Sequence, residues 1–216
     1  MEQKEVRVLL EQVAGGKMDI DEAMLKLKEA PFEDLGFAKP DYHRALRQGI
    51  AEVIYGAGKT PEQIHDIVAS MVQQGQKSIL ITRMSSEAAE AIEQDFIIKY
   101  DKYSRIGLVG EIPEPDGIGK VVVAAAGTSD LPVAEEAAQT AECFGNEVIR
   151  LYDVGVAGLH RLLAHREEIM TARVIVAVAG MEGALASVIG GLADCPVIAV
   201  PTSVGYGASF GGVSAL

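Results

Sequence analysis

Residues 174–207 read VIVAVAGMEGALASVIGGLADCPVIAVPTSVGYG. This stretch contains an apolar strand, a glycine-rich turn, a helix of small residues, a second apolar strand and a second glycine-rich turn. Buried apolar strands joined through a helix are typical of parallel sheets that carry helices on both faces. One carboxylate, Glu182, lies in the first turn. The stretch therefore predicts a parallel α/β fold.

The same order recurs over residues 118–216. Residues 121–130 read VVVAAAGTSD, in which an apolar strand again ends in a glycine followed by polar residues. We expect strands at 120–126, 147–152, 174–179 and 197–200, and helices at 131–143, 158–170 and 184–192. Alternating strands and helices predict a parallel sheet covered by helices. In the second helix, Leu159, Leu162 and Leu163 are expected to form the buried face.

Two further parts precede this domain. Residues 1–49 read as a helical segment and linker, with Ala23, Met24, Leu27 and Ala30 on the apolar side of its second helix. Residues 50–112 read as a small α/β domain, in which Thr60 and Gln63 form a capping box at the start of a helix. The segment PEPDG at 113–117 marks the boundary to the domain at 118–216.

Composition limits the class of protein. The chain has 216 residues, a net charge of −12 and no apolar run of the about 20 residues that cross a bilayer. The acidic balance argues against nucleic acid as a partner, because phosphate binding needs clustered cations. The charged N-terminus does not resemble a secretory signal, so we expect a cytoplasmic protein without a membrane-bound part. Cys143 and Cys195 form neither a metal-binding pattern nor a disulfide framework.

Polar and small residues follow the predicted strands and form the candidate ligand site. The carboxyl ends of parallel strands meet at one edge of the sheet, where ligands bind in such folds. The candidate substrate-binding residues at this edge are Gly127, Thr128, Ser129, Asp153, Arg161, Gly180, Met181, Gly183, Thr202, Ser203, Gly205 and Tyr206.

Three residues are candidates for a catalytic role: Asp130, His160 and Glu182. Asp130 could bind a ligand or cap the helix that follows it. His160 could transfer protons near neutral pH, and Arg161 beside it could pair with a phosphate or carboxylate, but a plain surface position is equally open for both. Glu182 could act as a base or stabilise a helix N-terminus.

Several motifs together resemble one family. The order GTSD (127–130), DVGVAGLHR (153–161), VAGMEGALASVIGGL (178–192) and VPTSVGYG (200–207) resembles the LarB-type nickel-pincer cofactor biosynthesis proteins. The N-terminal stretches DYHR (41–44) and EVIYGAGKT (52–60) are similar to theirs as well. The C-terminal domain also resembles aminoimidazole ribonucleotide carboxylases, whose Gly-Ser-x-Ser-Asp turn is close to residues 127–130.

The resemblance implies a carboxylase and hydrolase that acts on nicotinic acid adenine dinucleotide. CO2 or bicarbonate would be the co-substrate, and the products would be pyridinium-3,5-biscarboxylic acid mononucleotide and AMP. It implies no tightly bound organic cofactor, leaves Mg2+ open as a helper at the phosphoanhydride, and implies a homo-octamer. The Ala- and Gly-rich helix at 184–192 would then lie at a subunit contact.

The resemblance also implies a cysteine nucleophile in an Asn-Ser-Cys motif downstream of Leu216. Neither Cys143 nor Cys195 matches that motif, so a chain that ends at Leu216 is expected to bind the dinucleotide without carboxylating it.

Two other functions remain open at this point. One is an aminoimidazole ribonucleotide carboxylase or mutase of purine synthesis, against which the long N-terminal region and the DVGVAGLHR segment count. The other is a non-catalytic nucleotide-binding module.

Overall fold

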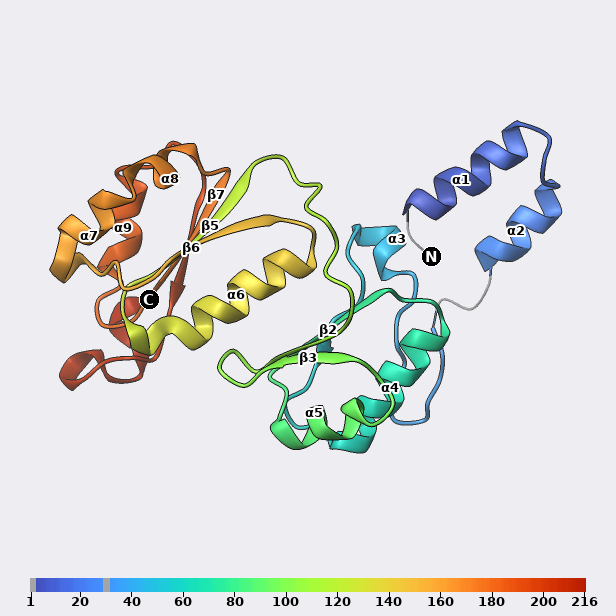
Figure 1. Ribbon diagram of the computed structural model, residues 1–216, viewed down its shortest axis with the longest axis horizontal. Helices are drawn as coiled ribbons and strands as arrows, with labels where there is room; N and C mark the ends of the chain where they lie inside the picture. The colour runs from blue at the N-terminus through green and yellow to red at the C-terminus, as the bar shows by residue number, and fades with distance from the viewer. Residues whose placement is uncertain (1–2, 29–31) are drawn as a thin grey trace. The chain divides into compact units, whose positions relative to one another are not determined.

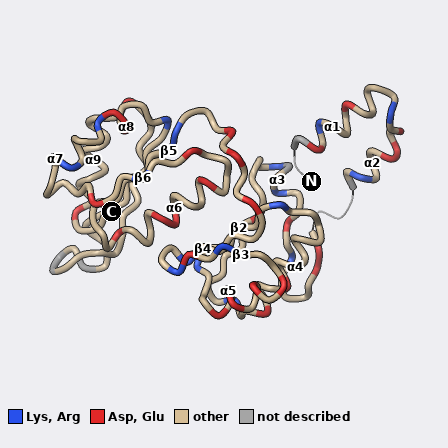
Figure 2. The backbone as a smooth tube through the Cα atoms, viewed as in Figure 1, with Lys and Arg blue, Asp and Glu red and all other residues tan. Residues whose placement is uncertain are grey.

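The computed structural model describes residues 3–28 and 32–216, and the chain divides into two compact units. The first unit comprises Met1–Lys99 and Gly107–Glu111. The second comprises Tyr100–Ile106 and Ile112–Leu216. Acidic residues occur along the backbone of both units (Figure 2).

The first unit begins with two helices, α1 (Gln3–Ala14) and α2 (Ile20–Lys28), which contact each other. The carboxylate of Asp19 accepts a hydrogen bond of 2.9 Å from the backbone N–H of Asp21, which satisfies one free donor of the α2 N-terminus. Ala23 is buried as expected, whereas Met24 is 45% exposed, because the short helix turns only a narrow side inward. Ala30 lies outside the described residues.

The segment that follows is anchored to the unit by buried polar side chains. After α3 (Arg44–Gln48) the chain reaches the sheet, and Tyr42, just before α3, is buried. The Tyr42 hydroxyl donates to a Glu33 carboxylate oxygen at 3.1 Å, and the Ser70 hydroxyl donates to the same oxygen at 2.6 Å. Ser70 belongs to α4 (Pro61–Gln73), so these bonds fix the segment to that helix.

A mixed four-stranded sheet forms the core of the first unit, although the end of β3, the turn after it and Ile106 are counted with the second unit. Its strands are β1 (Ile54–Tyr55), β2 (Ser78–Thr82), β3 (Ile98–Asp101) and β4 (Ile106–Gly110), in the order β1-β2-β4-β3. The helices α4 and α5 (Ser86–Glu93) contact each other. The capping box of Thr60 and Gln63 is present, and Ile64, Ile67, Val68 and Met71 on α4 are buried.

The second unit is a parallel sheet of four strands with helices on both faces (Figure 1). The strands are β5 (Lys120–Ala125), β6 (Glu147–Leu151), β7 (Val174–Ala179) and β8 (Val197–Pro201), in the order β6-β5-β7-β8. The register pairs Val123 with Val176 and Val176 with Ile198. This is the parallel, helix-covered α/β fold that the sequence predicts.

The two faces of this sheet are covered unequally. One face packs against α7 (Leu159–Ala164), α8 (Arg166–Thr171) and α9 (Ala184–Gly190), which contribute Leu162, Ile169, Leu185 and Ile189 to the core. The other face packs against α6 (Leu131–Cys143) through Ala134 and Ala138. Small alanines let α6 approach the sheet closely.

The prediction of a single helix at 158–170 is wrong, because the structure has two helices there. The chain leaves helical geometry at His165, with φ −104° and ψ 28°, so α7 and α8 are separate helices of six residues each. Of the three leucines expected on the buried face, only Leu162 is buried, while Leu159 and Leu163 are 42% and 46% exposed. A helix this short presents a single residue to the sheet, which explains the difference.

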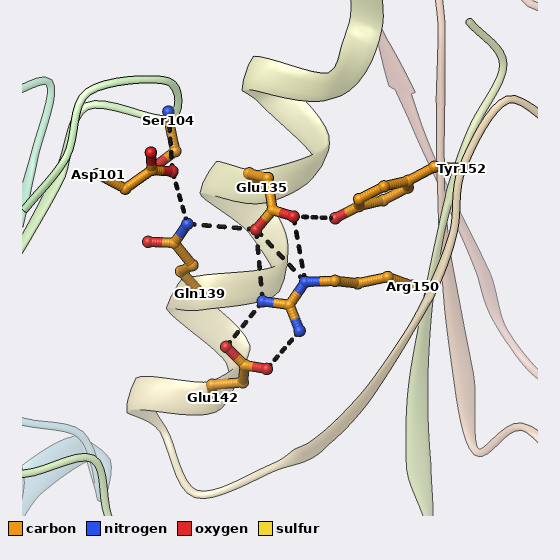
Figure 3. A network of polar contacts seen from close by, with 7 residues as sticks. All are labelled: Asp101, Ser104, Glu135, Gln139, Glu142, Arg150 and Tyr152. Atoms are coloured by element: carbon orange, nitrogen blue, oxygen red, sulfur yellow. Dashed lines mark hydrogen bonds and ion pairs between the residues drawn. The ribbon is translucent and has the colours of Figure 1, made fainter. Parts of the chain in front are cut away.

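A network of polar side chains joins α6 to β6 and to the turn at 101–104 (Figure 3). Arg150 lies between two carboxylates of α6, with its Nε 3.2 Å from Glu135 and one terminal nitrogen 2.8 Å from Glu142. The Tyr152 hydroxyl donates to Glu135 at 2.7 Å. Gln139 connects Glu135 to Asp101. The network therefore fixes the end of the edge strand β6 against its covering helix.

The network shifts the pKa values of its members. Burial opposes ionisation of Glu135, but hydrogen bonds from Tyr152 and Gln139 and the charge of Arg150 outweigh it and hold the pKa of Glu135 below its ordinary value. Hydrogen bonding to Glu142 and Glu135 raises the pKa of Arg150. Burial and the neighbouring Glu135 carboxylate raise the pKa of Tyr152. The ionised carboxylate is thus the form that stabilises the fold.

We expect Glu135→Gln to lower the stability of the second unit at pH 7 by about 1–2 kcal/mol, because it removes a partly buried charged acceptor. A carboxyl whose pKa is lowered by folding stabilises fully above its ordinary pKa of 4.5, and this contribution is lost as the pH falls through the lowered folded value. The gap between variant and wild type, followed by circular dichroism on heating, should therefore be constant well above pH 4.5 and should close as the pH falls below 4.5 and through the lowered pKa of the folded protein.

The control is Glu147→Gln, since Glu147 forms an exposed ion pair with Lys120 at 2.9 Å and should contribute less than about 1 kcal/mol. An equal loss of stability for Glu135→Gln at pH 7 and at the acid end would show that packing, and not charge, is responsible.

Candidate active site

Four loops meet at one edge of the sheet in the second unit, because its four strands run parallel. The loops follow β5, β6, β7 and β8 and are residues 126–130, 152–158, 180–183 and 202–206. They contain all the predicted substrate-binding residues except Arg161, which lies in α7 beside the second loop.

The topology singles out the position between β5 and β7. The chain leaves β5 towards α6 on one face of the sheet and leaves β7 towards α9 on the opposite face. The two strands are neighbours, so their loops diverge at this point. Ligands of open α/β sheets bind outside the strand ends at such a switch point. The loops after β5 and β7 are therefore the centre of the candidate site.

The loop after β5 exposes two hydroxyl groups. Thr128 and Ser129 lie in the short 3-10 helix η1 (Thr128–Asp130) directly before α6, and both are exposed. The thirteen-residue helix α6 begins behind them, with Pro132 in its first turn. Hydroxyls at a helix N-terminus favour an anion such as a phosphate.

Asp130, in contrast, is buried and is 4% exposed. One carboxylate oxygen accepts the backbone N–H of Gly127 at 3.1 Å, and the other accepts the hydroxyl of Thr202 at 2.7 Å. Thr202 is itself buried, with 6% exposure. The two candidates thus bind each other and join the loop after β5 to the loop after β8.

The loop after β7 presents Glu182, which is exposed. Its neighbour Met181 has φ 55°, a left-handed conformation that costs a side-chain-bearing residue about 1–2 kcal/mol. The Met181 N–H donates to the carbonyl of Val204 at 2.8 Å, and its carbonyl accepts the hydroxyl of Ser214 at 2.6 Å. Both polar backbone groups of the strained residue are therefore held from outside the loop.

Two glycines make this arrangement possible. A Cβ on Gly180 would lie 2.2 Å from the carbonyl oxygen of Val204. Gly183 has φ 67°, and a Cβ there would lie 2.9 Å from the carbonyl oxygen of Ala215 in the 3-10 helix η3 (Gly207–Ala215). Glycine allows both close approaches.

The loop after β6 is fixed to the end of β5. Val154 and Gly155 donate backbone hydrogen bonds to Ala125 and Ala126 at 3.1 and 2.8 Å. Asp153, with φ 57°, forms an ion pair with Arg161. His160 is exposed near the start of α7.

The loop after β8 contributes Ser203 and Tyr206, which are exposed, the latter by 76%. Gly205 packs closely on the backbone of Ser209, where a Cβ would lie 2.3 Å from the carbonyl oxygen. The glycine-rich turn after β8 is thus packed against the segment that follows it, η3.

Both cysteines lie away from this edge. Cys143 ends α6, which runs back towards the start of β6, and Cys195 precedes β8. Both are therefore near the amino ends of the strands. Burial, together with the charge of Glu142, raises the pKa of Cys143 to about 11, so this thiol is protonated at neutral pH.

Sequence reasoning missed two residues, Val204 and Ser214, which hold the loop of Glu182. The backbone of Val204 acts through its carbonyl, for which the side chain gives no signal. Ser214 lies 33 residues after Met181, in a Gly- and Ser-rich segment that gives no helix periodicity.

Within residues 3–28 and 32–216, no three His, Cys, Asp or Glu side chains are grouped so that they could hold a metal ion. In the same residues, no helix has both the length and the apolar character needed to cross a membrane.

Comparison with known proteins agrees with both units. Residues 120–216, which form the parallel sheet and its polar edge, match the model of the AIR carboxylases. Residues 32–111 match the LarB/PurE-like N-terminal domain. An uncharacterized protein of Methanocaldococcus jannaschii is 38% identical over 213 residues, which cover 94% of this chain and 83% of that protein. The chain belongs to the LarB-type family, and its domains indicate a carboxylase.

We expect Gly180→Ala to destabilise the second unit by about 1–3 kcal/mol, because the new Cβ overlaps the Val204 carbonyl oxygen that also accepts the Met181 N–H. Thermal unfolding by circular dichroism measures the loss. The matched control is Gly190→Ala in α9, where no atom lies within 4 Å of a Cβ; this change should be neutral or stabilise by up to about 1 kcal/mol. Equal unfolding temperatures for the two variants would contradict the close approach at Gly180.

Proposed function

We propose that this protein carboxylates the pyridinium ring of nicotinic acid adenine dinucleotide and hydrolyses its phosphoanhydride. The products are pyridinium-3,5-biscarboxylic acid mononucleotide and AMP. The observation that carries the proposal is the pair of loops at the β5/β7 switch point, one with exposed hydroxyls before a helix and one with an exposed carboxylate. The substrate carries phosphates, which the hydroxyls can bind, and a ring that must lose a proton, which the carboxylate can accept.

In this proposal, Thr128, Ser129 and the α6 N-terminus bind the phosphates of the substrate. Arg161 has a charge that suits the ring carboxylate or a phosphate, and Asp153 orients it through their ion pair. Ser203 and Tyr206 lie on the loop after β8 and bind the ribose or the ring. His160, exposed beside Arg161, is the second proton carrier, at the phosphoanhydride.

Glu182 is the proposed base of the carboxylation. A pyridinium carbon is electrophilic and does not attack CO2. A thiolate that adds to the ring gives an enamine-like carbon, which forms the new C–C bond with CO2. Glu182 then takes the proton from that carbon, and the thiolate leaves as the ring regains its aromaticity. The thiolate is thus regenerated, and one ring hydrogen is replaced by a carboxylate.

Neither cysteine of this chain is assigned the role of that thiolate, since both lie near the amino ends of the strands and Cys143 is held as a thiol. Mg2+ is a proposed helper at the phosphoanhydride, where the phosphates of the substrate would hold it. CO2 or bicarbonate is the co-substrate, and the reaction needs no tightly bound organic cofactor.

One observation favours a second function, that of an aminoimidazole ribonucleotide carboxylase or mutase. The match of residues 120–216 to AIR carboxylase suits a ring that is itself nucleophilic and needs no thiolate. A non-catalytic nucleotide-binding module would use the same loops without Glu182 as a base.

We expect Glu182→Gln to lower turnover by about a hundredfold or more while leaving dinucleotide affinity within a few-fold, because glutamine keeps the shape but cannot take a proton. The measurement is incorporation of labelled CO2 into nicotinic acid adenine dinucleotide, with AMP release followed in parallel, on the protein expressed from its complete gene. Glu167→Gln, an exposed change on α8, is the control.

Normal turnover in Glu182→Gln would remove Glu182 from the mechanism. Labelled CO2 in aminoimidazole ribonucleotide, and none in the dinucleotide, would establish the second function. Binding of the dinucleotide without formation of any product would support the third function, a non-catalytic nucleotide-binding module.

We also propose a homo-oligomer, by resemblance an octamer. The sheet face covered only by α6 leaves Ile198 of the edge strand β8 53% exposed, and α9 carries small side chains such as the exposed Ser187. Small residues allow helices of different subunits to approach closely.

Light scattering should give the mass of an octamer for the wild type and a lower mass for Ser187→Arg, because a long charged side chain would separate helices packed through α9. Glu90→Arg, on the exposed side of α5, introduces the same side chain in the other unit and is the control. A monomeric wild type would contradict the oligomer, and an unchanged mass for Ser187→Arg would contradict the contact through α9.

A further inference from the structure

We infer that Asp130 and Thr202 are positioning residues that couple the phosphate loop to the loop of Glu182. The inference rests on the proposed function and deepens it, since it separates the groups that touch substrate from those that hold them. The path of hydrogen bonds runs from Gly127 through Asp130, Thr202, Val204 and Met181 to Ser214, and we call it the clamp.

The Asp130 carboxylate is fully engaged by the protein. Its two oxygens accept one donor each, the Gly127 N–H at 3.1 Å and the Thr202 hydroxyl at 2.7 Å, and the side chain is 4% exposed. At 4% exposure, Asp130 offers little surface to a substrate ribose or ring proton. Asp130 therefore acts on the substrate indirectly: it holds the backbone of residues 127–129, and the hydroxyls of Thr128 and Ser129 are exposed.

Thr202 connects Asp130 to the loop after β8 and to the end of β7. Its single hydroxyl proton is donated to Asp130, and the same oxygen accepts the Val204 N–H at 3.4 Å. Its own backbone N–H donates to Ala179, the last residue of β7, at 3.0 Å. Thr202 is thus fixed between the ends of β5 and β7, which flank the switch point.

Val204 completes the path. Its carbonyl accepts the Met181 N–H at 2.8 Å, and Ser214 donates to the Met181 carbonyl at 2.6 Å. Met181 has a left-handed conformation that is unfavourable by itself, so it persists only while the hydrogen bonds to Val204 and Ser214 hold it. The direction of the adjacent Glu182 therefore depends on the clamp.

The consequence is mechanical coupling across the site. A phosphate that pulls on Thr128 and Ser129 displaces Asp130, and Asp130 is bonded to Thr202. Because the buried bond joins a charged acceptor to a neutral donor, its loss should be felt at both loops.

The test compares Thr202→Val, which keeps the shape and removes the hydroxyl, with Thr202→Ser, which keeps the hydroxyl. The first readout needs no substrate and is amide hydrogen exchange at Gly127, Met181 and Val204. We expect Thr202→Val to speed exchange at these amides by about tenfold or more, and Thr202→Ser to restore the wild-type rates within a few-fold.

The second readout is the split between kcat and KM of the proposed carboxylation. Misdirected Glu182 should lower kcat about tenfold or more in Thr202→Val with a smaller change in KM, again rescued by serine. Ser214→Ala removes only the outermost bond from an exposed side chain, so its folding is not at risk. It should speed exchange at Met181 and leave Gly127 unchanged.

Unchanged exchange at Met181 in both Thr202→Val and Ser214→Ala would overturn the clamp, as would a serine variant as impaired as the valine variant. If the wild type binds no dinucleotide, the proposed function fails, while the exchange rates still decide the clamp.

Discussion

One buried hydrogen bond, from the Thr202 hydroxyl to the Asp130 carboxylate, determines how the candidate site is arranged. It joins residues 72 positions apart in the sequence and closes the loops after β5 and β8 over the end of β7. A charged acceptor at 4% exposure is unfavourable unless donors satisfy it, and here the protein supplies two. The loops after β5 and β8 are therefore held in place, because moving either one would leave the buried Asp130 carboxylate without a hydrogen-bond donor.

The strand order explains why this hydrogen bond lies at the candidate site. Four parallel strands bring all loops to one edge, and from the central pair β5 and β7 the chain continues to opposite edges of the sheet, β6 and β8, through helices on opposite faces. The polar groups that remain exposed, Thr128, Ser129 and Glu182, flank that point, whereas the buried polar groups connect them. The exposed polar residues are therefore the ones that we propose face the ligand, and the buried ones hold the loops together.

The sequence predicted the parallel sheet and the loops of the site, because apolar strands that end in glycine and polar residues leave few alternatives. It also predicted the α4 capping box and its buried face, since these depend on local spacing. It did not reveal that Leu159 and Leu163 are exposed, as no Gly or Pro marks the break at His165. The left-handed Met181 and the inward direction of Asp130 depend on Val204, Ser214 and Thr202, which are distant in sequence.

The position of the cysteines bears on which ring this edge can carboxylate. Anion-binding hydroxyls and one base serve both a pyridinium and an aminoimidazole substrate, so they do not discriminate. The thiolate does, because an electron-poor pyridinium must gain electrons before it can attack CO2, whereas an electron-rich aminoimidazole need not. Both cysteines of this chain lie near the amino ends of the strands, and Cys143 has a raised pKa. A thiolate at the loops of Ser129 and Glu182 is therefore the one requirement by which the proposed pyridinium carboxylation differs from carboxylation of an aminoimidazole.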